Sequence, residues 1–504
     1  MSRPLINFLA GWLLLFAIAP TSGQERCRSS SSYPEVIISP WSNLQKAIAD
    51  LDIDDRGNSV ASVFEMGNWV SVSCHLLDSC GNRSSEPLIL FKDGIARRGT
   101  VAKEKNGDFF VAWLTDACAR AQAFDGMGQP LGEVRFLSPG NNCLRPAFGE
   151  QGPARMVSDG FGHYLVAWNL GDMNGPDPGT IYGTRVRQYD RSGVWLGLEF
   201  SIDNTKYYEE IQQNGTAPVI GLASRNGITV LVTLGLSPDR GFLSYTVWIL
   251  DENLTLRRPP FFATTRGTWP TDGWSPEAVA MSSSGDFTVV WQYPGDGWFD
   301  GTADVMDRIL AQRFSRDGER LGEEIAVSGP PILHAQFRQP AIAMDAAGNS
   351  IVAWPWIRRG LIIGQRFAPD GQKLGRIFQI NVSGPGRDVA IPALNDDGVM
   401  AVGYSLGEDA GPQAVATRIL DFHAQEFIRG DADDSLSLDI TDAVAILDYL
   451  FAGGTLKPVW MAGDVNDDGT IELTDAIHLL LYLFIDRSIV IPPPFIGPGF
   501  DSTP

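Results

Sequence analysis

The sequence predicts a mainly β protein: a β-propeller of about seven four-stranded antiparallel blades, followed by a small α-helical domain. Three observations carry this prediction. A strand pattern that begins at glycine and ends at tryptophan recurs along residues 58–427. Turn signals flank the copies. Two acidic loops, each followed by an amphipathic helix pattern, occupy residues 428–487. Repeats whose units hold several strands are typical of propellers, in which radial closure leaves few exposed sheet edges.

The N-terminal residues 1–23 have the layout of a secretory signal peptide. An early arginine precedes an apolar run from Phe8 to Ala19, and the small residues after it favour cleavage after Gly23. An uncleaved membrane anchor is the alternative, but the run is shorter than the ~20 residues that a spanning helix needs. We therefore expect a secreted or cell-surface protein with no membrane span after cleavage, in which residues 24–57 form an N-terminal segment before the repeats.

The charge balance argues against nucleic acid as a partner. Lys and Arg number 39 against 60 Asp and Glu, a formal net charge of −21, whereas binding to phosphates needs clustered basic residues. Residues 428–487 are especially acidic, with twelve Asp and Glu against three Lys and Arg. A cation-binding region explains this local concentration better than a general solubility effect.

Five cysteines, at positions 27, 74, 80, 118 and 143, are compatible with disulfides in an exported chain. The pairs closest in sequence, Cys74 with Cys80 and Cys118 with Cys143, are the simplest assignment, which leaves Cys27 unpaired. No spacing among the five matches a zinc site. We therefore expect the cysteines to be structural.

The repeated apolar run is expected to be the second strand, strand b, of each blade. The clear copies are GDFFVAW (107–113), GHYLVAW (162–168), GDFTVVW (285–291) and GNSIVAW (348–354), and the weaker ones are GNWVSVS (67–73), GITVLVT (227–233) and GVMAVGY (398–404). A short strand pattern precedes the glycine, and two strand-like runs around an Asp-Gly hairpin signal follow the tryptophan, as at 317–318 and 370–371. Seven copies predict seven blades, with six or eight left open by the weaker copies. The tryptophans that end the clear copies, Trp113, Trp168, Trp291 and Trp354, are expected to pack between blades.

The loops at one end of the propeller form the predicted binding face. Because strand direction alternates within a blade, the loops between the second and third strands emerge at the same end as the connections between blades. These segments are long at 169–180, 265–276 and 292–307. Among several aspartates they hold the aromatic residues Trp269, Trp274, Trp298 and Phe299, which are the candidate ligand-binding residues. Aromatic rings beside carboxylates on loops suit a carbohydrate ligand. The alternative is that the aromatic rings only cover the blade ends.

Signals for catalysis are weak. The segment GYSLG (403–407) has the form of a nucleophile elbow around Ser405, but a loop and a strand pattern follow it instead of the helix that the elbow needs. The segment SSSGDFTVVW (282–291) is only superficially similar to the aspartate boxes of sialidase-type glycosidases, because its Asp follows the Gly. No catalytic residue is assigned from the sequence.

Two segments near the C-terminus follow the pattern of a calcium loop, with oxygen ligands at positions 1, 3, 5, 7, 9 and 12 and glycine at position 6. In the second segment the ligand positions hold Asp464, Asn466, Asp468, Thr470 (through its carbonyl), Glu472 and Asp475. In the first they hold Asp431, Asp433, Ser435, Ser437, Asp439 and Asp442. Position 6 is Gly469 in the second loop but Leu436 in the first, where the backbone favours glycine. Since Ser435 is also an uncharged ligand, we expect Ca²⁺ in the second loop and weak or no Ca²⁺ in the first.

The segments GDADDSLSLDITDAVAILDYLF (430–451) and GDVNDDGTIELTDAIHLLLYLF (463–484) together resemble a type I dockerin. The resemblance implies two loop–helix units folded around calcium. It also implies attachment to a cohesin domain through positions 10 and 11, here Ile440-Thr441 and Leu473-Thr474. Dockerin-like tails also occur in secreted bacterial proteins with no evident cohesin system, so another cell-surface partner stays open. Residues 488–504 are rich in Pro and Gly and are predicted to be a flexible tail.

These observations favour a secreted, non-catalytic binding or scaffold protein in a polysaccharide-related context. Its propeller would recognise a ligand, and its calcium-dependent module would attach it. The alternative is an extracellular glycoside hydrolase or other carbohydrate-active enzyme whose carboxylates lie in the propeller loops, since two carboxylates suffice for glycoside hydrolysis. A purely structural surface protein is the third hypothesis.

Overall fold

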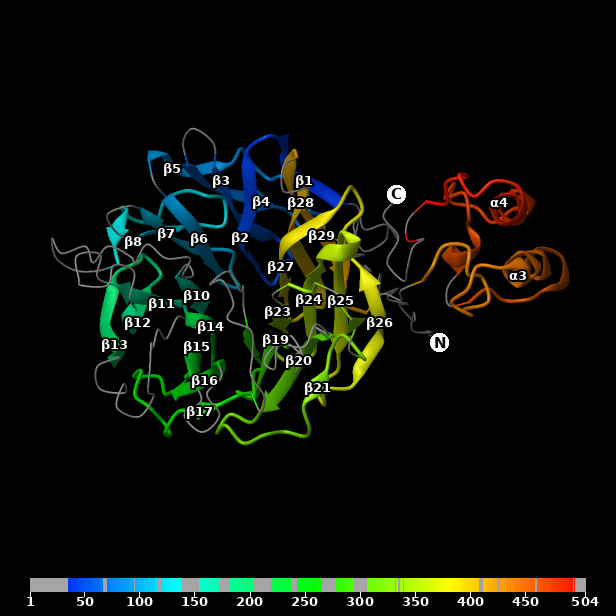
Figure 1. Cartoon of the computed structure of the whole chain (residues 1–504). Coiled ribbons are helices and arrows are strands. Elements are labelled where there is room, and N and C mark those ends of the chain that lie inside the picture. The colour runs from blue at the N-terminus through cyan, green and yellow to red at the C-terminus, as the bar shows by residue number, and fades with distance from the viewer. Residues whose placement is uncertain are drawn as a thin grey trace, which may run out of the picture.

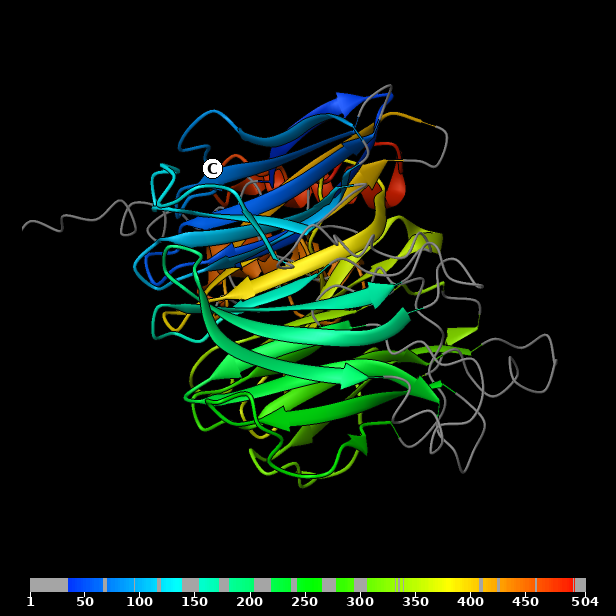
Figure 2. The ribbon, with the colours of Figure 1, turned by 90° about the vertical axis from the view of Figure 1, so that its left-hand side faces the viewer.

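The protein is a seven-bladed β-propeller with a small helical module beside it (Figure 1). The structure, a computed structural model, describes residues 35–66, 70–94, 96–115, 119–137, 154–171, 181–203, 219–236, 243–264, 278–293, 306–330, 332–333, 336–338, 340–407, 411–423, 427–457, 460–492 and 494. The predicted fold class is confirmed: the blades are four-stranded antiparallel sheets, one of which has an additional short strand, and two helices follow near the C-terminus. The strands of the first six blades follow sequence order, and the N-terminal strand completes the seventh. Figure 2 shows the blades from the side.

The first four blades follow the chain from the innermost strand to the rim. Blade 1 contains β2 (Gln45–Ile53), β3 (Ser59–Met66), β4 (Val70–Leu77) and β5 (Leu88–Gly94). Blade 2 contains β6 (Ala96–Lys103), β7 (Phe109–Thr115), β8 (Ala119–Phe124) and β9 (Arg135–Phe136). Blade 3 contains β10 (Arg155–Ser158), β11 (His163–Gly171), β12 (Ile181–Asp190) and β13 (Trp195–Asp203). Blade 4 contains β14 (Val219–Arg225), β15 (Ile228–Leu236), β16 (Leu243–Leu250) and β17 (Phe261–Phe262).

The last three blades complete the ring. Blade 5 contains β18 (Val279–Met281), β19 (Phe287–Tyr293), β20 (Met306–Phe314) and β21 (Ile325–Ala326), and β22 (Ile332–Leu333) also pairs with β20. Blade 6 contains β23 (Ala341–Met344), β24 (Ser350–Trp356), β25 (Leu361–Phe367) and β26 (Lys373–Gln379), with a 3₁₀ turn, η2 (Ile357–Arg359), between its middle strands. Blade 7 contains β27 (Gly386–Leu394), β28 (Val399–Gly407), β29 (Gln413–Asp421) and β1 (Glu35–Ser42).

The N-terminal strand closes the ring, because β1 pairs with β29 at the outer edge of the last blade. The Glu35 carboxylate secures this strand by accepting hydrogen bonds from the backbone N–H groups of Val382 (2.8 Å) and Ser383 (2.7 Å) and from the Tyr404 hydroxyl. The propeller therefore takes in strands β1 and β2, which lie within the segment 24–57 that the sequence analysis set apart.

The tryptophans that end the clear strand-b copies pack between blades, as predicted. Trp113, Trp168, Trp291 and Trp354 are all buried. Trp291 belongs to a cluster that joins blades 4 and 5, and Trp354 to one that joins blades 5 and 6. Burial of such a large ring contributes several kcal/mol by the usual ~25 cal/mol per Å² of apolar area, so these contacts stabilise the closed ring.

One repeat was misplaced by the sequence analysis. Strand b of blade 1 is β3, which follows Gly57, and the segment GNWVSVS (67–73) leads into the next strand, β4. Gly57 has a φ of 83° in the turn before β3, where its N–H donates to the Asp54 carbonyl at 3.0 Å. Val63 stands at the place that tryptophan has in the clear copies and is fully buried. Because this copy has valine instead of tryptophan, it does not show the glycine-to-tryptophan pattern that identifies the clear copies.

The expected disulfide between Cys74 and Cys80 is wrong. Cys74 is a buried free thiol on β4, and burial raises its pKa well above the ordinary range. Cys80 is disulfide-bonded, so its partner is one of the cysteines outside the described residues. Closeness in sequence misled the assignment, because Cys74 points into the packed interior between blades 1 and 2.

The helical module contains α3 (Ile440–Ala452), the 3₁₀ turn η3 (Trp460–Gly463) and α4 (Leu473–Phe484). Its core joins residues of both units, among them Ile446 and Leu479. Ile491 is buried in the same core, and the Pro494 carbonyl accepts a hydrogen bond from the Arg429 N–H at 2.6 Å. The start of the predicted flexible tail, 488–504, therefore packs on the module. Among the described residues, no helix is both long and apolar enough to cross a membrane.

Candidate functional site

The aromatic residues of the predicted carbohydrate-binding face are not among the described residues. They are Trp269, Trp274, Trp298 and Phe299. The hypothesis therefore stays a prediction. Ser405, the residue of the rejected nucleophile elbow, lies buried on β28, its hydroxyl accepts the Ile48 N–H at 3.3 Å, and β29 follows it instead of a helix.

The first calcium-type loop brings three of its predicted ligands to one point. Carboxylate oxygens of Asp431, Asp433 and Asp442 lie within 4.8 Å of one another. Asp442 accepts hydrogen bonds from the N–H groups of Ala432 (2.9 Å) and Asp433 (3.3 Å) through one oxygen and from that of Asp439 (2.9 Å) through the other. Asp431 accepts from the N–H groups of Ser435 (2.9 Å) and Leu436 (3.0 Å). The backbone therefore fixes both carboxylates toward the loop centre.

The second loop has the same scaffold. Asp475 accepts hydrogen bonds from the N–H groups of Val465 (2.8 Å), Asn466 (3.1 Å) and Glu472 (2.9 Å). Asp464 accepts from the N–H groups of Asp468 (3.1 Å) and Gly469 (3.0 Å). Each bond has its counterpart at the same offset in the first loop. Both loops thus hold their first and last ligand residues by the same five backbone donors.

The other predicted ligands have additional partners. Asp439 caps α3 by accepting the Thr441 N–H at 2.7 Å, and the Ser435 hydroxyl donates to the Ser437 carbonyl at 3.2 Å. In the second loop the Asn466 amide (2.9 Å) and the Thr470 hydroxyl (2.7 Å) donate to the Asp468 carboxylate. These contacts link the loop side chains to one another and to the start of α3, and the predicted ligand atoms in both loops are all oxygen. Oxygen donors of this kind fit a hard cation such as calcium.

Burial of the loop carboxylates makes their negative charge costly without a cation. Burial, together with the charges of Asp433 and Asp431, raises the pKa of Asp442 to about 7, against the effect of its backbone hydrogen bonds. Burial likewise raises the pKa values of Asp431 and Asp464. A divalent cation at the loop centre would offset this electrostatic cost.

The two loops differ in the residue at position 6. Leu436 has a φ of 68° and Gly469 a φ of 84°, so both loops place this residue in the left-handed region. Only glycine adopts that conformation without a penalty, which is ~1–2 kcal/mol for other residues. The strain in Leu436 therefore weakens the loop conformation that would bind calcium.

Replacing Leu436 by glycine is expected to raise the calcium affinity of the first loop about fivefold, because the ~1–2 kcal/mol of strain is partly offset by the greater freedom of glycine in the unfolded chain. Calorimetric titration of the full chain with calcium measures this change. Leu436→Ala is the matched control, since it keeps the Cβ atom and the strain. An equal gain in both variants would contradict the conformational argument.

A second feature is a cavity of ≈370 Å³ at one end of the propeller channel, where the innermost strands turn back into strands b. This volume lies within the ~300–1,000 Å³ range of small-molecule pockets. Blades 1 and 2 supply much of its charge: Asp50 and Asp52 from β2, and Lys103 at the end of β6. Several other blades contribute neutral side chains, such as Leu222 and Leu394.

The two aspartates of β2 join blade 1 to blade 2. Asp50 accepts hydrogen bonds from the Thr100 hydroxyl (2.6 Å) and the Val101 N–H (2.9 Å), and Asp52 accepts the Lys103 N–H (2.6 Å). Burial raises the pKa values of both carboxyls, that of Asp52 to about 7. Asp52 touches the channel but is surrounded by protein, so it is partly accessible and still poorly solvated.

Asp396, which follows β27 of blade 7 and lines this cavity, contacts residues of three other blades. Its carboxylate contacts Lys105 Nζ of blade 2 at 2.8 Å, Arg225 Nη1 of blade 4 at 3.6 Å and the Ala346 N–H of blade 6 at 2.7 Å. Burial opposes its ionisation, but these donors and charges outweigh burial and lower its pKa. Since Lys103 also pairs with Asp54 at 3.1 Å, each of the three cations lining the cavity already has an aspartate partner.

The channel residues were not among those predicted from the sequence. The segment ADLDID (49–54) alternates acidic and apolar residues, and this period of two is the signal of a strand with one polar face. No pattern in the sequence identifies Asp396, because its partners come from three other blades.

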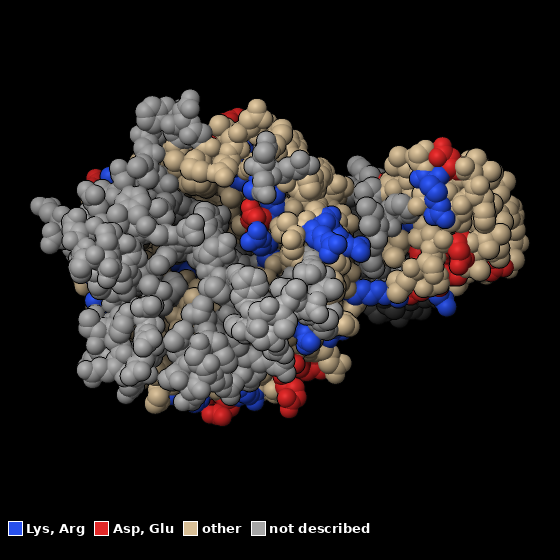
Figure 3. Space-filling view, viewed as in Figure 1, with Lys and Arg blue, Asp and Glu red and all other residues tan. Residues whose placement is uncertain are grey.

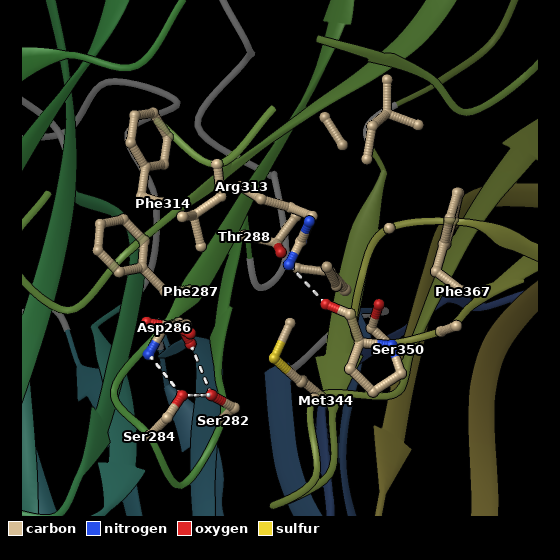
Figure 4. Close-up of a pocket in the computed structure, with 18 of the residues that line it drawn as sticks. Ser282, Ser284, Asp286, Phe287, Thr288, Arg313, Phe314, Met344, Ser350 and Phe367 are labelled. Carbon is tan, nitrogen blue, oxygen red and sulfur yellow. Dashed lines mark hydrogen bonds between the residues drawn. The ribbon is translucent and has the colours of Figure 1, made fainter. Parts of the chain in front are cut away.

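A smaller pocket of ≈70 Å³ lies between blades 5 and 6 (Figure 4). Phe287 and Phe314 line one side, and Ser350 and Phe367 belong to the neighbouring blade. Arg313 crosses between the blades and donates to the Pro369 carbonyl at 2.6 Å. The volume is far below the ~300 Å³ of small-molecule pockets, so we interpret it as a packing gap.

Comparison with known proteins gives likenesses of fold alone. No protein-family model and no curated protein matches the chain. Among solved structures it is similar to the Dos1 propeller, with 12% identity and a TM-score of 0.40 over 79% of this chain and 84% of that one. It is also similar to the β-propeller domain of the Trilobed protease from Pyrococcus furiosus, with 9% identity and a TM-score of 0.42 over 75% of this chain and 99% of that one. A third similar structure is the polysaccharide lyase Uly1, with 10% identity and a TM-score of 0.42 over 73% of this chain and 90% of that one. We draw no argument about function from these values.

Proposed function

We propose that this chain is an exported, non-catalytic binding protein whose C-terminal module, stabilised by calcium, attaches it to a protein partner. The observation that carries the proposal is the matched pair of loops. Each loop holds the buried carboxylates of its first and last ligand residues through the same five backbone hydrogen bonds. Oxygen-only donor sets in loops of this spacing suit calcium. On the face in view in Figure 3, the module carries scattered acidic and basic side chains on a mostly uncharged surface.

Exposed apolar side chains on the module support a protein partner. They occupy equivalent positions of the two units: Ile440, Val444 and Phe451 on α3, and Leu473, Ile477 and Phe484 on α4. Ile440 is 53% exposed and Leu473 49%, and these are the position-10 residues that the dockerin resemblance assigns to cohesin contact. Exposed apolar surface of this kind marks interaction sites. A cohesin-like domain or another cell-surface protein is the proposed partner.

Export and a carbohydrate ligand complete the proposal. The signal-peptide pattern of residues 1–23 and the disulfide at Cys80 both suit an oxidising, extracellular environment. The propeller is a rigid scaffold whose long loops carry aromatic residues, which suits recognition of a carbohydrate.

Adding calcium to the calcium-free full chain is expected to reveal one tighter and one weaker site, and to raise the unfolding temperature of the helical module. The reason is that a ligand bound only to the folded state stabilises it, by about 2.7 kcal/mol at a hundredfold excess over Kd. Calorimetric titration measures the sites, and thermal unfolding followed by helical circular dichroism measures the stabilisation. Magnesium at the same concentration is the control. A chain that shows neither heat of binding nor a shift with calcium would overturn the proposal.

A further inference from the structure

Position 4 of each loop, which supplies no ligand, carries an aspartate that pairs with an arginine from outside the loop. Asp434 (φ 63°) and Asp467 (φ 62°) both lie in the left-handed region. Asp434 of the first loop meets Arg376 of β26 in the propeller at 3.0 Å. Asp467 of the second loop meets Arg429 at 2.8 Å. The two pairs differ in burial: the Arg376 side chain is 43% exposed, whereas that of Arg429 is 0% exposed.

Arg429 contacts two segments that lie far from it in the sequence. Its guanidinium donates to the Asp464 carbonyl at 2.7 Å and pairs with the Asp467 carboxylate. Its own backbone N–H donates to the Pro494 carbonyl at 2.6 Å, and its guanidinium lies 5.6 Å from the ring of Phe427. One side chain thus joins the segment that leaves the propeller to the second loop, and the same residue joins that segment to the C-terminal tail.

The loop–helix fold does not by itself require this arginine. The residue at the equivalent place in the second unit is Ala462, which is also fully buried. A buried guanidinium has a large desolvation cost that only good partners offset. Two partners of the Arg429 guanidinium are the backbone of the position-1 ligand and the position-4 side chain of the second loop. The contact therefore fixes the stretch of that loop from Asp464 to Asp467.

We propose that Arg429 is a positioning residue of the second calcium loop, which it holds in the binding conformation and ties to the segment that leaves the propeller. The inference rests on the calcium site of the proposed function. Positioning and charge predict opposite effects of removing Arg429 on calcium affinity. A positive charge beside a bound cation repels it, so charge alone predicts tighter calcium binding when Arg429 is removed. Positioning predicts weaker binding.

The test uses calcium titration of the full chain carrying Arg429→Lys or Arg429→Met. Lysine keeps the charge but not the two-point contact of the planar guanidinium. We expect both variants to bind calcium in the second loop about tenfold more weakly than the unaltered chain. Arg487→Met is the matched control, since Arg487 lies in the same module and stacks on Tyr482 (4.9 Å). This variant should keep the original affinity.

The outcomes separate this inference from the proposed function. If the unaltered chain binds no calcium, both fail. The other case is that the unaltered chain binds calcium and Asp464→Asn weakens that binding. If both Arg429 variants then bind calcium at least as tightly as the unaltered chain, only the positioning role is overturned. Helical circular dichroism in excess calcium shows whether each variant folds. If the methionine variant does not fold, the lysine variant decides. Failure of both to fold even in excess calcium would make Arg429 a structural residue and overturn the inference.

Discussion

Replacing Trp291 by alanine is expected to destabilise the propeller by about 3–5 kcal/mol, the usual cost of removing a buried tryptophan. Trp291 is 0% exposed. It lies on β19 in a cluster that includes Val232, Tyr245 and Ala278, so the loss would open a cavity between blades 4 and 5. Denaturant unfolding of the full chain, followed by tryptophan fluorescence or strand circular dichroism, measures the change in the free energy of unfolding.

Trp291→Phe is the control that separates packing from hydrogen bonding. Among the described residues, no acceptor receives the indole N–H of Trp291. Phenylalanine therefore loses part of the ring volume but no bond, and we expect a cost of about 1–2 kcal/mol, well below that of the alanine variant. If both variants lost the same stability, the packing explanation would be wrong.

The repeated strand could be predicted from the sequence because one side-chain pattern and one backbone requirement coincide in it. In the clear copies the glycine turn and the tryptophan stand six residues apart, as in Gly348 and Trp354. Where Val63 replaces the tryptophan, the turn glycine remains but the glycine-to-tryptophan pattern is absent. The prediction of strand b therefore fell on the neighbouring segment 67–73. Ring closure by β1 could not be predicted, because its partner β29 lies at the other end of the propeller sequence, where Arg418 pairs with Glu35, and the pairing has no local signal.

The calcium-type loops were predictable for a different reason: their ligands, their turn and their following helix all lie within one short segment. The fixed spacing predicts which side chains converge, and it identifies Leu436 as the strained position. The contacts that bind the loops to the rest of the chain were not predictable. Arg429 lies 35 residues before the carbonyl it reaches, and Asp396 meets partners from three other blades. Such long-range contacts follow only from the complete fold.

Replacing Asp475 by alanine is expected to abolish calcium binding in the second loop, with affinity reduced more than a hundredfold. The side chain is fully buried and accepts the N–H groups of Val465, Asn466 and Glu472. Alanine removes the position-12 ligand and leaves three donors without their acceptor, at about 1–3 kcal/mol for each buried group. The loop then loses both its metal ligand and its scaffold. Calcium titration of the full chain measures the loss.

Two comparison variants show whether the effect belongs to this loop. Asp486→Ala removes an exposed acid just beyond α4, so it should leave both calcium sites unchanged if the loss is not a general effect of charge. Asp442→Ala makes the equivalent change in the first loop and should remove only the weaker site, because each loop has its own backbone donors. If Asp475→Ala still bound calcium in the second loop with the original affinity, the ligand assignment would be wrong, since no other residue at position 12 could replace the lost carboxylate.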